Sequence, residues 1–199
     1  MSSALESVAG RRFTVEEYYR MAETGILGPD ERVELVHGVI RKMSPKTWAH
    51  VMATRAVFLE LERALRGRAS VYFEAPLEAA QIDSEPEPDV LVCSNPDEWA
   101  YRSRRTKPLL VVEVADSSLD YDLGEKAGLY AEASVPEYWV VNLVGRVLEV
   151  FREPEPGSYR VRFSLEESAR VTPSAWPELS FAVSDFLPRS SSAPSETAP

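Results

Sequence analysis

Two acidic side chains lie inside apolar segments of this chain. Asp89 belongs to residues 88–92 (PDVLV), and Glu113 belongs to residues 109–114 (LLVVEV). Both segments are typical of buried strands. An ionised carboxylate in such a strand is costly unless it is paired or binds a cation. The fold must therefore bring each acid to a partner, and a divalent metal ion would serve both.

The length of the chain suits a single well-buried domain. Its 199 residues are 44% hydrophobic and 27% charged, which is ordinary for a globular protein. We expect the folded domain to cover residues 13–187, with disordered tails at 1–12 and 188–199. No apolar run approaches the roughly 20 residues of a membrane span. The lone Cys93 cannot form an internal disulfide, and the N-terminus lacks a secretory pattern, so we expect a cytoplasmic protein.

Helix and strand signals alternate along the chain. Thr14 and Glu17 fit a capping box, which predicts a first helix that ends just before Gly25. The further expected elements are a hairpin over 33–36 and 39–43, a helix over 47–65, strands over 71–73, 90–92 and 109–114, a helix over 121–133, strands over 137–143 and 146–151, and edge strands over 160–163 and 179–183. This order predicts an α/β domain, with a mixed central sheet flanked by helices and an N-terminal helix and hairpin.

The two acids suit phosphodiester chemistry. Side chains alternate across a strand, so Val112 and Val114 face away from Glu113. If the strands of Asp89 and Glu113 pair, their carboxylates could share one Mg²⁺ or Mn²⁺, ions that prefer oxygen ligands. Such a metal polarises a phosphoryl oxygen and lowers the pKa of a bound water. A nearby lysine would stabilise the developing charge, but the usual position, two residues after the glutamate, holds Ala115.

Lys126 is the candidate for the missing lysine. On a helix, Asp122, Lys126 and Tyr130 are four residues apart and share a face. If that helix packs beside the strand of Glu113, Lys126 reaches the site. The alternative is an exposed lysine paired with Asp122, and local patterns alone favour it. A lone carboxylate such as Glu34 is likewise more often salt-bridged than metal-bound.

The net charge of −10 argues against a broad nucleic-acid surface, because binders of nucleic acid usually carry a basic footprint. Two local basic patches are candidates, residues 102–107 (RSRRTK) and Arg41-Lys42 with Lys46. On charge alone, solvated loops explain both patches better. A metal can still offset carboxylates at a site, so an acidic chain is compatible with cleavage.

Several segments together resemble a known family. In chain order they are residues 34–38 (ELVHG), 43–45 (MSP), His50, 87–90 (EPDV), 111–114 (VVEV), 121–122 (YD) with Lys126 and Tyr130, and 135–141 (VPEYWVV). Each is weak alone, but their order and spacing are specific. The chain resembles the Uma-two family, bacterial proteins with the PD-(D/E)xK restriction-endonuclease-like fold.

The resemblance implies a role for each site residue. It implies Asp89 and Glu113 as metal ligands, Lys126 as a catalytic lysine displaced to the helix, and Glu34 as an upstream supporting acid. The expected activity is Mg²⁺- or Mn²⁺-dependent cleavage of DNA. Two rivals stay open: a binding protein that does not cut, and a hydrolase of a small phosphodiester. A homodimer is expected only by analogy with nucleases that cut both strands.

Other polar and aromatic residues have structural explanations. His50 begins the long helix and could contact phosphate or sit near the metal, although a capping or surface role explains it better. His37 suits a turn, and core packing accounts for Trp139. Tyr130 fits a cleft and a helix–sheet interface equally well. Asp116 replaces the Ser-Pro common in relatives, which alters a loop but removes no ligand.

Overall fold

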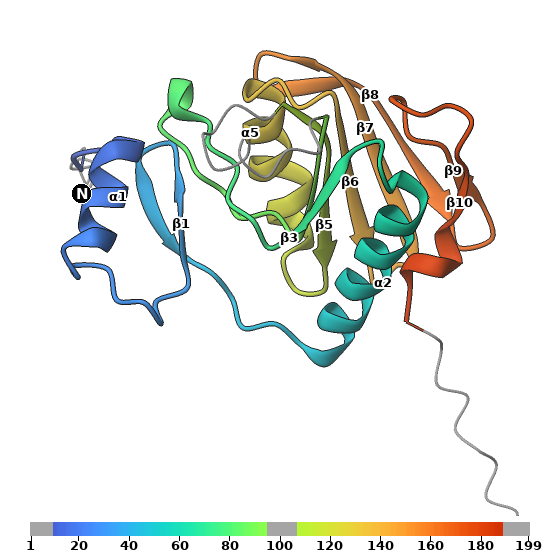
Figure 1. Ribbon diagram of the computed structural model, residues 1–199, viewed down its shortest axis with the longest axis horizontal. Coiled ribbons are helices and arrows are strands. Elements are labelled where there is room, and N and C mark those ends of the chain that lie inside the picture. Colours follow the sequence, from blue (N-terminus) through green and yellow to red (C-terminus); the bar gives the residue numbers. More distant parts are fainter. Residues whose placement is uncertain (1–9, 95–106, 189–199) are drawn as a thin grey trace, which may run out of the picture. The chain divides into compact units, whose positions relative to one another are not determined.

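The computed structural model describes residues 10–94 and 107–188. The predicted basic residues 102–106 and most of the two predicted tails lie outside the described residues. The chain forms two compact units (Figure 1). The first unit comprises the chain up to Ser44 together with Pro76–Glu87, and the second comprises Pro45–Ala75 and the chain from Pro88 onward.

The first unit contains the predicted N-terminal helix and hairpin. Helix α1 (Val15–Glu23) begins with the capping box, in which the Thr14 side chain accepts from the Glu17 backbone N–H and the Glu17 side chain accepts from that of Thr14. Strands β1 (Val33–Val36) and β2 (Val39–Lys42) pair antiparallel. A 3₁₀ turn, η1, covers Ala80–Ile82.

The hairpin turn has the predicted tight geometry. His37 and Gly38 both have positive φ, 47° and 74°, as a two-residue turn of this kind requires. A Cβ at Gly38 would lie 2.9 Å from the carbonyl oxygen of Phe13, so glycine is needed there for space as well as for φ.

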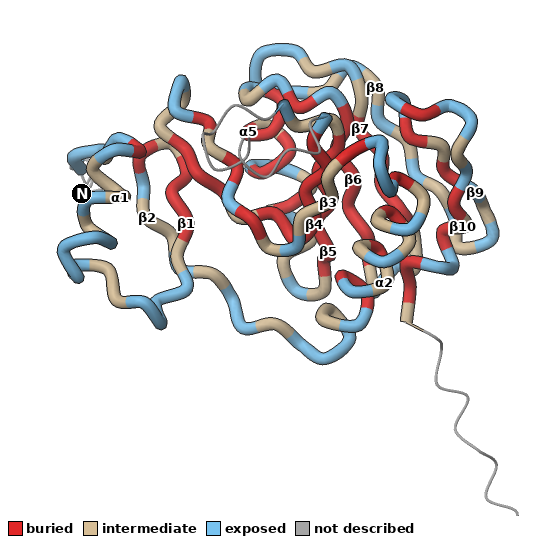
Figure 2. The backbone as a smooth tube through the Cα atoms, in the orientation of Figure 1, coloured by how far each residue is buried: buried red, intermediate tan, exposed pale blue. Residues whose placement is uncertain are grey.

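The second unit is built on a six-stranded mixed sheet of order β3-β4-β5-β6-β7-β8. Its strands are β3 (Ser70–Phe73), β4 (Val90–Cys93), β5 (Pro108–Ala115), β6 (Glu137–Asn142), β7 (Val147–Glu155) and β8 (Ser158–Glu166). Only the β5–β6 pair is parallel among the pairings of this sheet. Strand β6 is buried throughout and β5 over most of its length (Figure 2). Continuous apolar runs are typical of such central strands.

Helix α2 (Trp48–Leu65) covers one face of this sheet (Figure 1). Its buried stripe of Ala53, Val57, Leu61 and Leu65 joins a hydrophobic core with Val112 and Val114. Because side chains alternate along β5, Glu113 lies on the opposite face, as the sequence predicted. Burial of an apolar side chain of this kind contributes roughly 1.5–3 kcal/mol.

The helical segment after β5 packs on the opposite face of the sheet. It consists of α4 (Leu119–Tyr121), a π-helical turn η2 (Asp122–Lys126) and α5 (Ala127–Glu132). The sequence predicted a regular helix here, and the π turn is a departure from it. Within α5, the ring of Tyr130 packs on that of Tyr138 from β6, with centroids 4.9 Å apart.

The C-terminal part of the second unit also differs from the prediction. Strand β10 (Phe181–Ala182) was expected at an edge of the main sheet, but it pairs with β9 (Arg170–Val171) in a separate two-stranded sheet. A 3₁₀ turn, η3 (Val183–Phe186), follows and joins the core beneath α2. Across the described part of the chain, no helix is long and apolar enough to span a membrane.

Candidate active site

The pairing of β4 with β5 brings the two predicted acids together. Val90 lies opposite Val112 in the antiparallel register, so Asp89, just before β4, lies next to Glu113. The Asp89 backbone N–H points to Glu113 Oε2, with N and O 3.4 Å apart. The Val114 backbone N–H donates to Asp89 Oδ2 at 2.8 Å. Both carboxylates are buried, as the apolar sequence around them predicted.

Two side chains of the following helical segment reach Glu113. Lys126 Nζ lies 2.7 Å from Glu113 Oε1, and the Tyr130 hydroxyl donates to the same oxygen at 2.6 Å. Lys126 is buried, so the alternative of an exposed lysine is wrong. The placement agrees with the expectation that Lys126 reaches the vacant position beyond Glu113. Its catalytic role stays a prediction.

The π turn is anchored on both sides. The Ser118 hydroxyl donates to Asp122 Oδ2 at 2.5 Å, and the Tyr138 hydroxyl donates to the Asp122 backbone carbonyl at 3.0 Å. A π turn inserts one extra residue into a helix and is frequent at functional sites. Here it ends at Lys126, the residue that contacts Glu113. The irregular turn therefore sets how the lysine is presented.

Asp89 has its own basic partners, which the sequence did not predict. Lys46 Nζ lies 2.8 Å from Asp89 Oδ1 and 2.9 Å from Glu74 Oε1. His50 Nε2 lies 3.1 Å from Asp89 Oδ2. Lys46 was expected in a solvated basic loop and His50 in a capping or surface role. Both expectations are wrong, because the side chains turn inward and are only 14% and 12% exposed.

The surroundings shift the pKa values of the two acids in opposite directions. Burial raises the pKa of Asp89, but the hydrogen bonds and charges of His50 and Lys46 outweigh it and lower the pKa to about 2. Burial dominates at Glu113 and, with the nearby charges of Asp89 and Asp122, raises its pKa to about 8 despite Lys126. Asp89 is therefore the acid that is ionised at neutral pH, and Glu113 is the one that holds a proton more readily.

A hydrogen bond ties the start of α2 to the loop after β5. The Thr47 side chain caps the helix by accepting from the His50 backbone N–H at 3.2 Å. The same hydroxyl donates to Asp116 Oδ2 at 2.7 Å. Asp116, a departure from the family pattern, thus links the segment that carries Lys46 and His50 to the strand that carries Glu113.

The donor set suits a hard divalent cation. Among the described residues, Glu113 Oε2 has only the long 3.4 Å contact to the Asp89 backbone, while Oε1 holds Lys126 and Tyr130. Oε2 is thus the oxygen available for a cation beside Asp89. No group of three or more His, Cys, Asp or Glu side chains in the described chain is arranged to hold a metal. Two carboxylates with water as the other ligands are nevertheless usual for Mg²⁺.

The remaining predicted site residue lies in the other unit. Glu34 is buried on β1 of the first unit, and its predicted support of the site stays a prediction. His37 is a turn residue and Trp139 a core residue, as expected. Lys46, His50 and Tyr130 join the predicted Asp89, Glu113 and Lys126 in one cluster. The sequence signals for Lys46 and His50 were weak: His50 stands among the segments that resemble the family, and Lys46 belongs to a candidate basic patch, but surface residues near a helix start explain both patterns equally well.

Comparisons with known proteins agree with this fold. A putative nuclease belonging to DUF820 from Anabaena variabilis has a crystal structure that superposes with a TM-score of 0.66 at 17% sequence identity. The match covers 87% of this chain and 97% of that chain, and it confirms the predicted restriction-endonuclease-like architecture. A comparison with curated proteins finds no match. The sequence model of one family matches residues 15–184, and the chain therefore belongs to the Uma2 family, described as "Putative restriction endonuclease".

Proposed function

We propose that the protein is a divalent-metal-dependent endonuclease that hydrolyses phosphodiester bonds in DNA. One observation carries the proposal: two buried acids and a buried lysine converge on one point. Lys126 Nζ lies 2.7 Å from one oxygen of Glu113, and the other oxygen faces the backbone N–H of Asp89 at 3.4 Å. The family description and the nuclease named as a structural relative support the reaction class.

Each residue has a chemical task in this proposal. Asp89 and Glu113 would hold Mg²⁺ or Mn²⁺, which supplies polarisation of the phosphoryl oxygen and a more acidic water. The Lys126 ammonium stabilises negative charge that develops on the phosphoryl group. The Tyr130 hydroxyl holds Glu113 Oε1, and this orients Oε2 toward Asp89. Burial of the cluster strengthens each of these electrostatic interactions.

The proposed substrate is DNA because the family description points to restriction-type nucleases. The net charge of −10 is the observation that favours the second candidate, a small phosphodiester substrate. Such a substrate would need fewer basic contacts than a duplex does. Both candidate substrates would be cleaved at the same site. They differ in whether the substrate also makes contacts outside that site.

Nicking of supercoiled plasmid at low salt, with Mg²⁺ or Mn²⁺, tests the proposal. Wild type should nick the plasmid, and Lys126→Met should lose nearly all activity while it still binds metal, because an ammonium is not a ligand. Arg160→Met is the matched control, since Arg160 is an exposed basic residue on β8, outside both candidate basic patches. Circular dichroism of each variant checks that it is folded.

Equal nicking by wild type and Lys126→Met would contradict the proposal. Cleavage of a small diester without any cleavage of DNA would move the function to the second candidate. Metal binding without cleavage of either substrate would favour the binding-protein alternative.

A further inference from the structure

Helix α2 carries an outer stripe that its packing does not explain. Trp48, Met52 and Leu59 are 76%, 41% and 43% exposed. Arg55 and Arg66 are also exposed, the latter at the C-terminal end of the helix. We call these five residues the α2 stripe. Their spacings of 4, 3, 4 and 7 residues place them on one side of a helix with 3.6 residues per turn.

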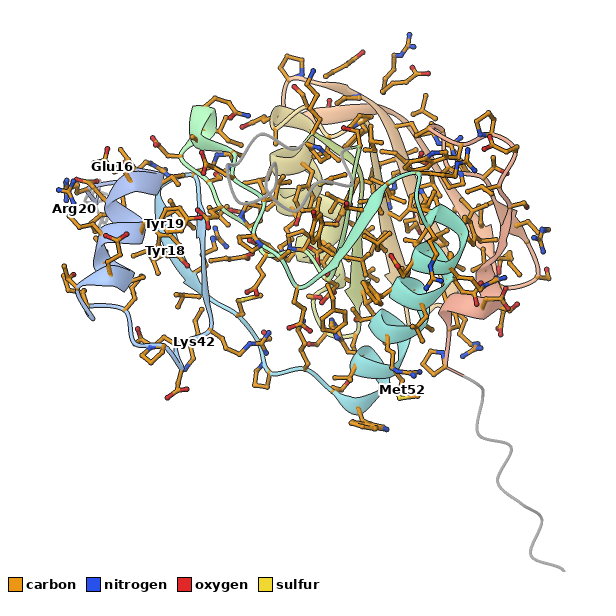
Figure 3. All side chains as sticks on the ribbon, viewed as in Figure 1. Glu16, Tyr18, Tyr19, Arg20, Lys42 and Met52 are labelled. Atoms are coloured by element: carbon orange, nitrogen blue, oxygen red, sulfur yellow. The ribbon has the colours of Figure 1, made fainter. Side chains whose placement is uncertain are left out.

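The stripe lies opposite the buried side of the same helix. Ala53, Val57, Leu61 and Leu65 face the core, and a helical projection puts them on the other half of α2. Figure 3 shows Met52 projecting outward from the first turns of α2. A tryptophan that is three-quarters exposed is unusual, because its large apolar surface gains free energy when it is covered.

The side of the helix that carries the stripe has two arginines, Arg55 and Arg66, and one glutamate, Glu62, so its net charge is positive in an acidic chain. Arg55 and Arg66 form no ion pair with any residue that the structure describes, whereas Arg63 pairs with Glu60 at 2.5 Å. Within the described chain, two guanidinium groups without an ion pair therefore lie among exposed apolar side chains. An aromatic ring combined with arginines is the surface that single-stranded nucleic acid recognises: bases stack on the ring, and phosphates pair with the cations.

The stripe begins in the same chain segment that reaches the candidate active site. Trp48 lies between Lys46 and His50, whose side chains both contact Asp89. The Thr47 hydroxyl, bonded to Asp116 and to the His50 backbone, fixes the backbone beside the tryptophan. At 1.5 Å per residue the helix extends about 27 Å from this point. His50 is two residues after Trp48, about 200° round the helix, so Trp48 and the candidate active site lie on different sides of the start of α2.

We propose that the α2 stripe binds a single-stranded segment of nucleic acid, with a base stacked on Trp48 and phosphates paired with Arg55 and Arg66. This inference rests on the proposed function in that it names the form of the substrate. It concerns binding alone, so it can be tested without metal and without cleavage.

Fluorescence anisotropy in EDTA, with a labelled oligothymidine of about 12 nucleotides, measures this binding. Trp48→Ala should weaken binding at least about fivefold, the lower end for loss of one stacked base. Intrinsic tryptophan fluorescence should fall on binding in wild type and change much less in Trp48→Ala. Arg55→Ala/Arg66→Ala should reduce the slope of log affinity against log salt by about 1.4, since each phosphate contact on a single strand contributes roughly 0.7.

Val144→Ala and Arg160→Ala are the matched controls, because both residues are well exposed in the same unit and neither belongs to α2. Both should bind like wild type. The inference is overturned if Trp48→Ala binds like Val144→Ala, or if wild type binds no oligonucleotide. It is also overturned if the protein forms dimers that Trp48→Ala abolishes, since a second copy would then cover the stripe.

The controls also separate this inference from the proposed function. Binding of the oligonucleotide that depends on the α2 stripe, without any plasmid nicking, would support this inference and contradict the proposed nuclease function. Plasmid nicking that does not depend on Trp48, Arg55 or Arg66 would support the proposed nuclease function and contradict this inference.

Discussion

The two oxygens of Glu113 have different surroundings, and this difference gives the residue two tasks. Oε1 receives the Lys126 ammonium and the Tyr130 hydroxyl, while Oε2 faces Asp89. Because burial raises the pKa of Glu113 to about 8, metal binding must displace a proton at neutral pH. A buried acid of this kind also links the stability of the protein to pH.

The free energy of unfolding of the metal-free protein should fall as pH rises from about 4.5 to about 8. Glu113 keeps its proton over this range in the folded state, whereas the unfolded chain loses it near the usual 4.5. The loss should be at most on the order of 1 kcal/mol per pH unit. Asp89 does not contribute to this pH dependence of the free energy of unfolding. Its pKa in the folded protein is lowered to about 2, so Asp89 is ionised in both the folded and the unfolded state over this range.

Urea unfolding at several pH values in EDTA measures this slope. Glu113→Gln should flatten the profile, since the amide does not titrate. An equal slope in wild type and Glu113→Gln would show that another group is responsible.

Lys46 is expected to compete with a metal ion for Asp89. Its ammonium lies 2.8 Å from Asp89 Oδ1. A cation bound to that carboxylate would be repelled by the positive charge of the ammonium. Two unit charges 4 Å apart interact by roughly 4 kcal/mol at an effective dielectric constant of 20, although a mobile lysine avoids part of this. Lys46→Met should therefore tighten Mn²⁺ binding by roughly tenfold.

Calorimetry with Mn²⁺ checks this effect, with Lys46→Arg as the control that keeps the charge. Unchanged or weaker binding by Lys46→Met would mean that Lys46 supports the site without competing for it.

The sequence predicted the acids and the lysine better than it predicted their partners. Asp89 and Glu113 stood out because charge in an apolar strand demands a partner. Ala115 at the usual position made Lys126 a candidate, local patterns alone favoured an exposed lysine, and the resemblance to the Uma-two family implied Lys126. Lys46 and His50 carried no such signal, since polar residues at a helix start are normally solvated.

Helix α2 depends on Thr47 at its start. Thr47→Val removes both the cap to the His50 backbone and the bond to Asp116. The free energy of unfolding should fall by about 1 kcal/mol, and by up to about 2 kcal/mol, as for other threonine caps. Asp116→Ala is the matched control, because it keeps the cap and loses only the link.

The urea midpoints of wild type, Thr47→Val and Asp116→Ala give the comparison. Thr47→Val should be less stable than Asp116→Ala. Equal stability of Thr47→Val and wild type would contradict a structural role for the cap.

Among the elements, the regular ones were predictable and the irregular ones were not. Helix α2 and strands β4, β5 and β6 have clear apolar periods and end at strong stop signals. The π turn at Asp122–Lys126 departs from a helix by one residue and leaves no mark in the hydrophobic pattern. Strand β9 has two residues, too few for an alternating pattern to show, and β10 lies within the strand predicted over 179–183 but pairs with β9 and not with the main sheet.

For the whole molecule, the charge sets how DNA should bind. With a net charge of −10 and few basic contacts, the affinity for DNA should depend only weakly on salt. A protein with 6–10 phosphate contacts loses roughly 10³–10⁵ in affinity between 50 and 200 mM salt, and this protein should lose less. Anisotropy titrations across that range measure the dependence of affinity on salt, and a loss of 10³ or more would contradict this prediction and point to an extended basic binding surface.

The family match at residues 15–184 spans both compact units. It fits the predicted fold: the order of helix and strand signals indicates an α/β domain with a mixed central sheet, and the resemblance to the Uma-two family implies its restriction-endonuclease-like form. The homodimer, expected by analogy, and the cytoplasmic location stay predictions.

Calorimetric titration with Mn²⁺ tests the central claim most directly, because every proposed step depends on Asp89 and Glu113 as ligands. Wild type should show one divalent-cation site, and Glu113→Gln and Asp89→Asn should each lose it while they remain folded by circular dichroism. Equal Mn²⁺ binding by wild type and Glu113→Gln would contradict the account.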